Sequence, residues 1–309
     1  METCPILSIV IVNYKQRDYT AQCLESLRAA APALDHEIIL VDNASADGSA
    51  DWLAEHYPEV RLIRSPENRG IAGGNNLGIR AARGRYVLLL NNDTLVQPGT
   101  LEEAVAYLEA HPDVAGVGGN LLNPDGSFQS GCVDFHSLGQ VFLIVTKLGP
   151  LFRRYYPSHP PADTPREVDW MSTAFMAFRR EALEQVGLVD EEFFIYSDET
   201  DLQYRLRQAG WKIVYLPTLR TIHFGGKSLS PWRRRHLFYR GLLLFFQKHL
   251  GPGHTVALRL LLAGTSVAKI LLWSPVWLSP WTRERAQVEL ASNVRVLRLS
   301  LGSGIPPAQ

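Results

Sequence analysis

Residues 84–94 read Gly84-Arg85-Tyr86-Val87-Leu88-Leu89-Leu90-Asn91-Asn92-Asp93-Thr94, an unbroken apolar run that meets three small polar side chains. The run Tyr86–Leu90 predicts a strand buried on both faces, as the strands of a parallel sheet are. The polar cluster then falls at the carboxyl end of the strand, where open α/β sheets bind ligands. Asp93 is suited to a divalent cation that holds phosphate oxygens. The same three residues also suit a turn, and this stretch alone favours neither interpretation.

The rest of the chain repeats the alternation of apolar strand and helix. Further strands are expected at residues 7–14, 37–43, 60–64, 114–118, 169–178 and 213–216, and helices at 19–30, 76–82, 101–111 and 179–186, with a last helix that begins at the acids of residues 198–201 and runs to residue 210. This alternation predicts a doubly wound, mostly parallel α/β sheet. The glycine-rich segment 68–78 enters one of the helices, where it favours an anion, although packing alone could also require the glycines. It is not Gly-x-Gly-x-x-Gly and does not follow the first strand, which disfavours a dinucleotide-binding fold.

Length and cysteine content bound the class of protein. The 309 residues suffice for one large domain or two smaller ones. The three cysteines, Cys4, Cys23 and Cys132, have no metal-ligand spacing and cannot all pair, which favours a reducing compartment. The first apolar run has no basic residues before it and is too short for a signal peptide, so we expect a cytoplasmic protein.

Charge is distributed unevenly along the chain although the net charge is zero. Residues 1–201 carry 29 acidic and 15 basic side chains, whereas residues 202–283 carry 13 basic and no acidic ones. The basic segment suggests an anionic partner such as phosphate, nucleic acid or a membrane surface. Its richness in Leu, Phe and Trp fits a lipid surface better than a nucleic acid, so no nucleic-acid partner is expected.

The C-terminal region is both apolar and basic. Its longest uncharged run, residues 270–282, has 13 residues and two prolines, whereas a transmembrane span needs about 20. We therefore expect an interfacial element, with Trp273, Trp277 and Trp281 at the headgroup level. A dimer interface or packing against the catalytic domain is the alternative. The expected domains are residues 1–230 and a helical extension over residues 231–309.

Two more polar groups are candidates for chemistry. Asp198-Glu199-Thr200-Asp201 follows an aromatic run, and three acids at the start of a helix can simply favour the helix dipole. They also suit a general base with a raised pKa, which we favour here. His223 precedes a Gly-Gly turn and a basic stretch, and is a candidate metal ligand. Residues 133–164 show no clear period and predict a mobile loop beside the site.

Seven ordered motifs resemble those of an inverting glycosyltransferase of family 2 with the GT-A fold, over about residues 6–250. The motifs are residues 8–14, 41–45, 68–78, 90–94, 124–130, 194–202 and 223–228. The resemblance implies that Asp42 and the end of the first strand hold the nucleotide base and ribose, and that the loop at residues 68–76 closes over the nucleotide. The implied nucleotide-binding residues are Asn13, Tyr14, Asp42, Asn43, Asn68, Gly70, Gly73, Asn75 and Asn92.

The resemblance also implies a metal site and a base. Asn91-Asn92-Asp93 stands where the family has Asp-x-Asp, so Mg²⁺ or Mn²⁺ would rely on Asp93, with His223 as a second ligand. Asp198-Glu199 stands where the family usually has Glu-Asp, so Glu199 takes the position of the base and Asp198 is the second candidate. A bound cation would stabilise the leaving diphosphate, and the base would take the proton of the acceptor hydroxyl.

Within the family, the motifs most resemble bacterial rhamnosyltransferases of cell-surface polysaccharide assembly. The implied donor is TDP-rhamnose, the acceptor a lipid-linked or glycan hydroxyl, and the location the inner face of the plasma membrane, with peripheral attachment. A transferase that uses a UDP- or GDP-sugar and an inactive, membrane-associated nucleotide-binding domain are the alternatives. A nucleotidyltransferase is disfavoured because Lys15-Gln16-Arg17, not a glycine-rich loop, follows the first strand.

Overall fold

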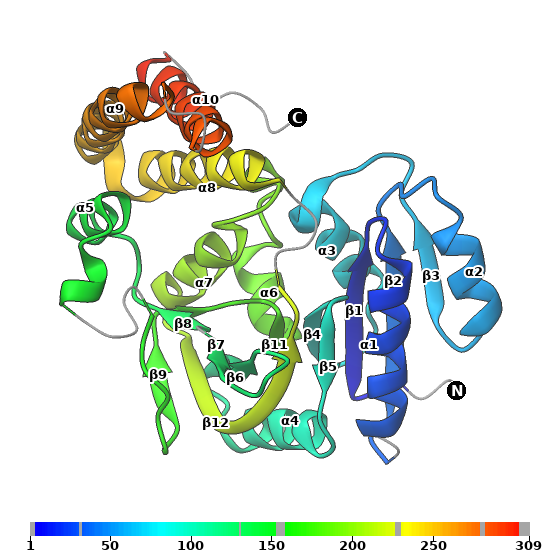
Figure 1. Cartoon of the computed structure of the whole chain (residues 1–309). Coiled ribbons are helices and arrows are strands. Elements are labelled where there is room, and N and C mark those ends of the chain that lie inside the picture. The colour runs from blue at the N-terminus through cyan, green and yellow to red at the C-terminus, as the bar shows by residue number, and fades with distance from the viewer. Residues whose placement is uncertain are drawn as a thin grey trace. The chain divides into compact units, whose positions relative to one another are not determined.

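The computed structural model describes residues 4–30, 33–129, 131–152, 158–225, 230–278 and 282–302 (Figure 1). The chain divides into two compact units. The first, which we call the sheet unit, comprises residues 1–135, 158–194 and 198–225. The second, the helical unit, comprises residues 136–157, 195–197 and 226–309.

The sheet unit contains one large mixed sheet. Its strands, in spatial order, are β3 (Arg61–Arg64), β2 (His36–Asp42), β1 (Leu7–Asn13), β4 (Tyr86–Asn91), β11 (Phe175–Arg179), β6 (Val114–Leu122), β12 (Lys212–His223) and β5 (Thr94–Val96), with β7 (Phe128–Gln129) beside β6 and β9 (Arg166–Val168) beside β12. β1 is parallel to both β2 and β4, and β6 is parallel to β12, whereas β11 runs antiparallel to its neighbours. The expected doubly wound, mostly parallel sheet is confirmed.

Helices cover both faces of this sheet because its central strands are apolar on both sides. They are α1 (Arg17–Ala30), α2 (Ser49–His56), α3 (Gly70–Ala81), α4 (Thr100–Ala110), α6 (Arg180–Val186) and α7 (Asp198–Gln208). Ile9 and Ile11 of β1 share a core with residues of α1 and α4, whereas Val10 and Val12 share the opposite core with residues of α3, α6 and α7. Alternate residues of one strand thus fill two cores, as a buried parallel strand requires.

The glycine-rich segment is a helix for most of its length. We expected a loop that enters a helix at Asn76, but α3 begins at Gly70. A Cβ at Gly74 would lie 2.7 Å from Val12 Cγ1, and one at Gly78 would lie 2.2 Å from Val10 Cγ1. These two glycines therefore let α3 approach β1 closely, which is the packing role that the sequence left open.

Three other boundaries differ from expectation. The strand expected at 169–178 is two strands, β10 (Trp170–Met171) and β11, with β10 paired to β8 (Cys132–Val133). β12 extends to His223 through a register shift between Leu216 and Arg220, so the histidine lies on a strand and not in a loop. Residues 133–164 were expected to lack regular structure, yet they include α5 (Leu138–Thr146), which Ser137 and Gln140 begin with a capping box.

The helical unit consists of α5, α8 (Pro231–Phe245), a π-helical turn (Phe246–Leu250), α9 (Gly251–Val276) and α10 (Arg283–Leu301). Gly251, with φ 81° and ψ 174°, ends the π-helical turn in a non-helical conformation, and Pro252 follows in the first turn of α9. By length and composition, the stretch Trp232–Val276 is able to cross a membrane, although core helices of soluble proteins pass the same test. The apolar helix also contains Arg259 and Lys269, so the length of the uncharged run does not by itself exclude a span.

Candidate active site

Strand register brings three of the sequence motifs to one edge of the sheet. β1 pairs Asn13 with Asp42 at the end of β2, and Val12 with Asn91 at the end of β4. The carboxyl ends of all three parallel strands therefore meet at the same edge. This edge is where an open α/β sheet binds its ligand.

Asn13 is a buried hub that holds Asp42 in place. Its Nδ2 donates to Asp42 Oδ1 at 3.0 Å and also lies 3.2 Å from Ser45 Oγ, while its Oδ1 accepts from Thr20 Oγ1 at 3.0 Å. Ser45 N–H donates to the other Asp42 oxygen at 3.2 Å. Because the amide of Asn13 is engaged inside the protein, its role at a nucleotide site would be to orient Asp42 rather than to contact the ligand.

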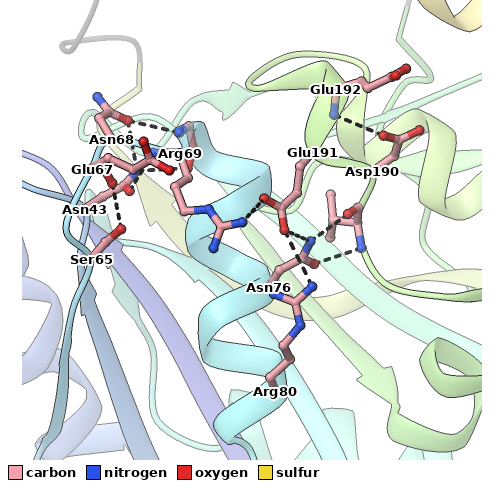
Figure 2. A network of polar contacts seen from close by, with 12 residues as sticks. Asn43, Ser65, Glu67, Asn68, Arg69, Asn76, Arg80, Asp190, Glu191 and Glu192 are labelled. Carbon is pink, nitrogen blue, oxygen red and sulfur yellow. Dashed lines mark hydrogen bonds and ion pairs between the residues drawn. The ribbon is translucent and has the colours of Figure 1, made fainter.

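A second network fixes the segment before α3 against the end of β2 (Figure 2). Asn43 Nδ2 donates to Asn68 Oδ1 at 3.1 Å and to Gly70 O at 2.9 Å, and Asn43 Oδ1 accepts from Arg69 N–H at 3.0 Å. Asn43, Asn68 and Gly70, three of the residues expected to surround the nucleotide, are thus joined in one wall. Tyr14 is exposed beside this wall and Asn75 is buried in α3.

Asp93 and His223 lie together at the end of β4 although 130 residues separate them. β12 is antiparallel to β5 and pairs His223 with Thr94, the residue after Asp93. Asp93 Oδ1 is 3.3 Å from His223 Nε2, and the two side chains are 16% and 15% exposed. The expectation that these two residues share a site therefore has a structural basis in strand pairing.

Gln129 orients the histidine, and it was not singled out from the sequence. Gln129 Oε1 is 2.6 Å from His223 Nδ1, and Gln129 Nε2 donates to Asn123 Oδ1 at 3.1 Å and to His223 O at 3.3 Å. With its oxygen facing Nδ1, the glutamine favours the tautomer that carries the proton on Nδ1. The Nε2 lone pair then faces Asp93, as a metal-binding imidazole requires.

The residues present fit a divalent cation that is held partly by substrate. Two ligands on adjacent corners of an octahedral Mg²⁺ site lie about 3 Å apart, close to the separation of Asp93 Oδ1 and His223 Nε2. Within the described ranges, no group of three or more His, Cys, Asp or Glu side chains could hold a metal. A cation at this pair would therefore need further oxygens, which a diphosphate supplies.

The acid pair lies at the start of α7. Asp198 is buried, and one of its oxygens, Oδ1, has no hydrogen-bond partner among the described residues. Burial and then the neighbouring Glu199 carboxyl, which shares a hydrogen bond with it, raise the pKa of Asp198 well above its usual value. Glu199 is only half-buried. The raised pKa that we expected in this cluster is therefore found at Asp198, the second of the two candidate bases.

The third acid of this cluster has a structural role. Asp201 is buried and accepts from Arg205 Nε at 2.8 Å, while the same guanidinium donates to the carbonyls of Val186 and Leu188. Gln203 exchanges two hydrogen bonds with the backbone of Met171, which holds α7 against β10. Asp201 and Gln203 thus fix the helix that presents the acid pair.

The remaining expected residues either make contacts within the protein or lie outside the described ranges. Asn92 donates to Thr20 Oγ1 at 2.9 Å, so its amide is engaged with α1. Gly73 lies on α3, where a Cβ would come 2.4 Å from Arg69 Cβ. Lys227 and Ser228 of the last motif, and Trp281, lie outside the described residues.

Comparisons with known proteins give relatives in sequence and in fold. The chain is 29% identical over 250 residues to the N-acetylglucosaminyl-diphospho-decaprenol L-rhamnosyltransferase of Mycobacterium tuberculosis, which covers 75% of this chain and 80% of the relative. It is 30% identical to the O-antigen biosynthesis protein RfbC of Myxococcus xanthus over 71% of this chain, but that match spans only 17% of RfbC.

Solved structures and a sequence family complete the comparison. The mannosyltransferase PcManGT of Pyrobaculum calidifontis, solved with GDP-Man and Mn²⁺, superposes with a TM-score of 0.58 at 19% identity and covers 97% of this chain and 88% of PcManGT. GalNAc-T7, solved with UDP, GalNAc and Mn²⁺, gives 0.55 at 15% identity, over 80% of this chain and 51% of GalNAc-T7. These likenesses confirm the GT-A fold. Residues 8–187 match the family described as Glycosyl transferase family 2, and the chain therefore belongs to this family of glycosyltransferases.

Proposed function

We propose that this glycosyltransferase moves rhamnose from TDP-rhamnose to a hydroxyl of a lipid-linked or glycan acceptor, with inversion at the anomeric carbon. The observation that carries the proposal is the Asp93–His223 pair at the strand edge, beside the wall built by Asp42 and Asn43. The mycobacterial relative, whose name states a rhamnosyl transfer to a diphospho-lipid acceptor, supports the choice of sugar and acceptor class.

In this proposal the sheet edge binds the donor. Asp42, held by Asn13 and Ser45, faces the base and ribose, and the Asn43–Asn68 network keeps the start of α3 beside the nucleotide. Asp93 and His223 would hold Mg²⁺ or Mn²⁺. Such a cation would neutralise charge that develops on the departing diphosphate.

Glu199 is the proposed base. Its carboxylate takes the proton of the acceptor hydroxyl as the oxygen attacks the anomeric carbon and the bond to the diphosphate breaks. Asp198, whose pKa is raised by burial and then by the neighbouring carboxyl, would hold Glu199 in position through their shared hydrogen bond. One displacement inverts the anomeric centre, so this reaction needs no second carboxylate as a nucleophile.

The helical unit is proposed to attach the enzyme peripherally to the inner face of the plasma membrane, with the domain boundary near residue 230. Leu260 and Leu271 on α9 are each 68% exposed, and Val256, Val267 and Leu278 continue the exposed stripe at helical spacing. Arg283 and Arg285 lie over the rings of Trp277 and Trp273. An apolar stripe with Trp and Arg beside it fits the interface of an anionic bilayer.

Vesicle flotation tests this attachment. The wild-type protein should float with vesicles that contain anionic phospholipid, and Leu260→Glu together with Leu271→Glu should leave it in the soluble fraction. Leu258, buried in the same helix, identifies the face that must not be altered. Equal flotation of both proteins would place the attachment elsewhere.

The transfer itself is tested with a panel of donors. TDP-rhamnose, UDP-sugars and GDP-sugars are incubated with the protein, an N-acetylglucosaminyl-diphospho-lipid acceptor and Mg²⁺ or Mn²⁺, and release of the nucleoside diphosphate is measured. Consumption of TDP-rhamnose alone supports the proposal, and consumption of another donor instead overturns the choice of sugar. If no donor is consumed and no nucleotide raises the melting temperature, the inactive nucleotide-binding alternative also fails.

A further inference from the structure

A continuous polar network runs from the end of β2 to the segment that precedes the acid pair (Figure 2). Asn43 holds the backbone of Arg69, as described above. The side chain of Arg69 then donates from Nη2 to Glu191 Oε2 at 2.6 Å. One ion pair therefore joins the proposed nucleotide wall to residues that lie 122 positions later in the sequence.

Glu191 receives further contacts from α3. Its Oε1 accepts from Asn76 Nδ2 at 3.0 Å and lies 3.6 Å from the guanidinium of Arg80. Asn76 also bonds both backbone groups of Val189, accepting from the N–H at 3.0 Å and donating to the carbonyl at 2.7 Å. Residues 69, 76 and 80 are spaced to lie on one side of the helix, so three side chains on that side contact the segment 189–191.

The two segments also pack without space between them. A Cβ at Gly70 would lie 2.2 Å from Phe194 O and 2.6 Å from Phe194 Cγ, and one at Gly73 would lie 3.1 Å from Glu191 Oε2. Ile71 N–H donates to Phe194 O at 2.7 Å. The glycines at 70 and 73 thus let α3 meet the backbone of residues 191–194 directly, with Glu191 at the centre of the contact.

Residues 189–194, which α3 holds, precede the acid pair by only a few positions in the sequence. Phe194, Tyr196 and Ser197 have φ values of 62°, 66° and 63°, in the left-handed region that non-glycine residues rarely adopt. Such conformations persist only where the surroundings hold them. Asp198 and Glu199 follow directly, so the grip on residues 189–194 fixes one end of a strained link to the proposed base.

Stability alone does not account for this arrangement. The side chains of Arg69 and Glu191 are 32% and 30% exposed, and ion pairs with this degree of solvent contact contribute little to the free energy of unfolding. What the pair does is set a distance. It connects the start of α3, which is expected beside the nucleotide, with residues 189–194, which precede the acid pair in the sequence.

We propose that Arg69 and Glu191 are positioning residues of the transfer reaction: their ion pair holds residues 189–194 on α3 and so places Glu199 relative to the bound donor. The inference rests on the proposed function, which puts the nucleotide beside Asp42 and Asn43 and makes Glu199 the base. It predicts that loss of the pair damages the chemical step and leaves donor binding intact.

The first test separates kcat from binding. Glu191→Gln and Arg69→Gln should each lower kcat about tenfold to a hundredfold, as a misplaced reacting group does, with KM for the donor within about twofold of wild type. Because both variants remove the same contact, the double variant should lose no more than either one. Glu184→Gln is the matched control, since Glu184 on α6 pairs with Arg180 at 2.9 Å on the surface, and it should keep the wild-type kcat.

The second test needs no activity. Hydrogen exchange is measured on the free proteins at the amides of Ile71 and Ala72, which donate to Phe194 O, and at Val189, which donates to Asn76. These amides should exchange faster in Glu191→Gln than in wild type, and at the wild-type rate in Glu184→Gln.

Distinct outcomes overturn the inference and the proposed function. Wild-type kcat or unchanged amide exchange in Glu191→Gln overturns the positioning role. An equal loss of kcat and nucleotide affinity also overturns it, because Glu191 would then support the donor site as a whole. If the wild-type protein consumes no sugar nucleotide, the proposed function fails, and amide exchange by itself decides whether Glu191 clamps the segment.

Discussion

The Asp93–His223 pair and the Asp198–Glu199 pair are both small polar clusters, but they differ in burial and in the partners of their side chains. Asp93 and His223 come from strands far apart in sequence, remain partly exposed, and have Gln129 to orient the imidazole. Asp198 and Glu199 are consecutive, and Asp198 is buried with one oxygen that lacks a partner among the described residues. The first environment places two ligand atoms within reach of one cation, whereas the second raises the pKa of one acid. This contrast is the basis for proposing charge neutralisation at the first pair and proton transfer at the second.

The largest expected effect is at the proposed cation pair. Asp93→Ala should lower kcat/KM by about a thousandfold or more, since a metal that stabilises a leaving group contributes several kcal/mol to the transition state. The melting-temperature increase that Mn²⁺ and TDP produce together should disappear as well. Both are measured on the purified protein, by diphosphate release and by thermal unfolding. A metal-dependent shift that survives in Asp93→Ala would remove this residue from the site.

The next effect distinguishes the two acids. Glu199→Gln should lower kcat by about a hundredfold to ten-thousandfold, the usual contribution of a general base, with the affinity for TDP and Mn²⁺ unchanged. Asp198→Asn keeps a hydrogen-bond donor beside Glu199 and should retain far more activity. Steady-state kinetics on both variants gives the answer. If Asp198→Asn is the more damaged of the two, the buried acid is the base and our assignment is reversed.

Gln129 offers a smaller effect that is specific to the cation pair. Gln129→Ala removes the partner of His223 Nδ1 and should weaken Mn²⁺ binding about tenfold to a hundredfold, as losses of residues behind a metal ligand do. Titration of Mn²⁺ against transfer rate measures this. Gln185→Ala, which removes the exposed partner of Trp211 Nε1, serves as the control. An unchanged Mn²⁺ dependence in Gln129→Ala would mean that the glutamine does not tune the histidine.

The position of a site residue can be predicted from the sequence where a local pattern determines it. Apolar runs that end in Asn13, Asp42 and Asn91 predicted strands, and parallel register then necessarily brings their ends together. Prediction from the sequence fails where position depends on distant partners. Gln129 acquires its role only because β12 delivers His223 beside it, and Glu191 only because α3 packs against it. Gln129 lies in the motif at residues 124–130, but nothing in that motif points to His223, and Glu191 lies in none of the seven motifs.

The glycines show the same limit in another form. Gly70, Gly74 and Gly78 belong to a segment that looks like a phosphate-binding loop, yet each one faces a neighbouring segment that a Cβ would strike. Composition cannot distinguish a glycine needed for a ligand from one needed for a close helix contact. The distance from an ideal Cβ position to Val10, Val12 or Phe194 makes this distinction. The sequence therefore predicts a helix start at Asn76, six residues after the observed start at Gly70.

The smallest expected effect concerns stability and sharpens the contrast at Asp198. Because its pKa is raised in the folded protein, the unfolded chain loses this proton at a lower pH than the folded one. Between those two pKa values the folded state binds more protons, so the free energy of unfolding falls as pH rises, by up to about 1.4 kcal/mol per pH unit. The side chain in Asp198→Asn cannot ionise, so the variant should not show this loss of unfolding free energy. Its stability relative to wild type should therefore increase from about pH 4 upward. Urea unfolding of both proteins between pH 4 and pH 8 measures the difference. If the difference in free energy of unfolding between the two proteins stays constant over this range, the pKa of Asp198 is not raised in the folded protein. The proposed contrast between the acid pair and the cation pair would then be wrong.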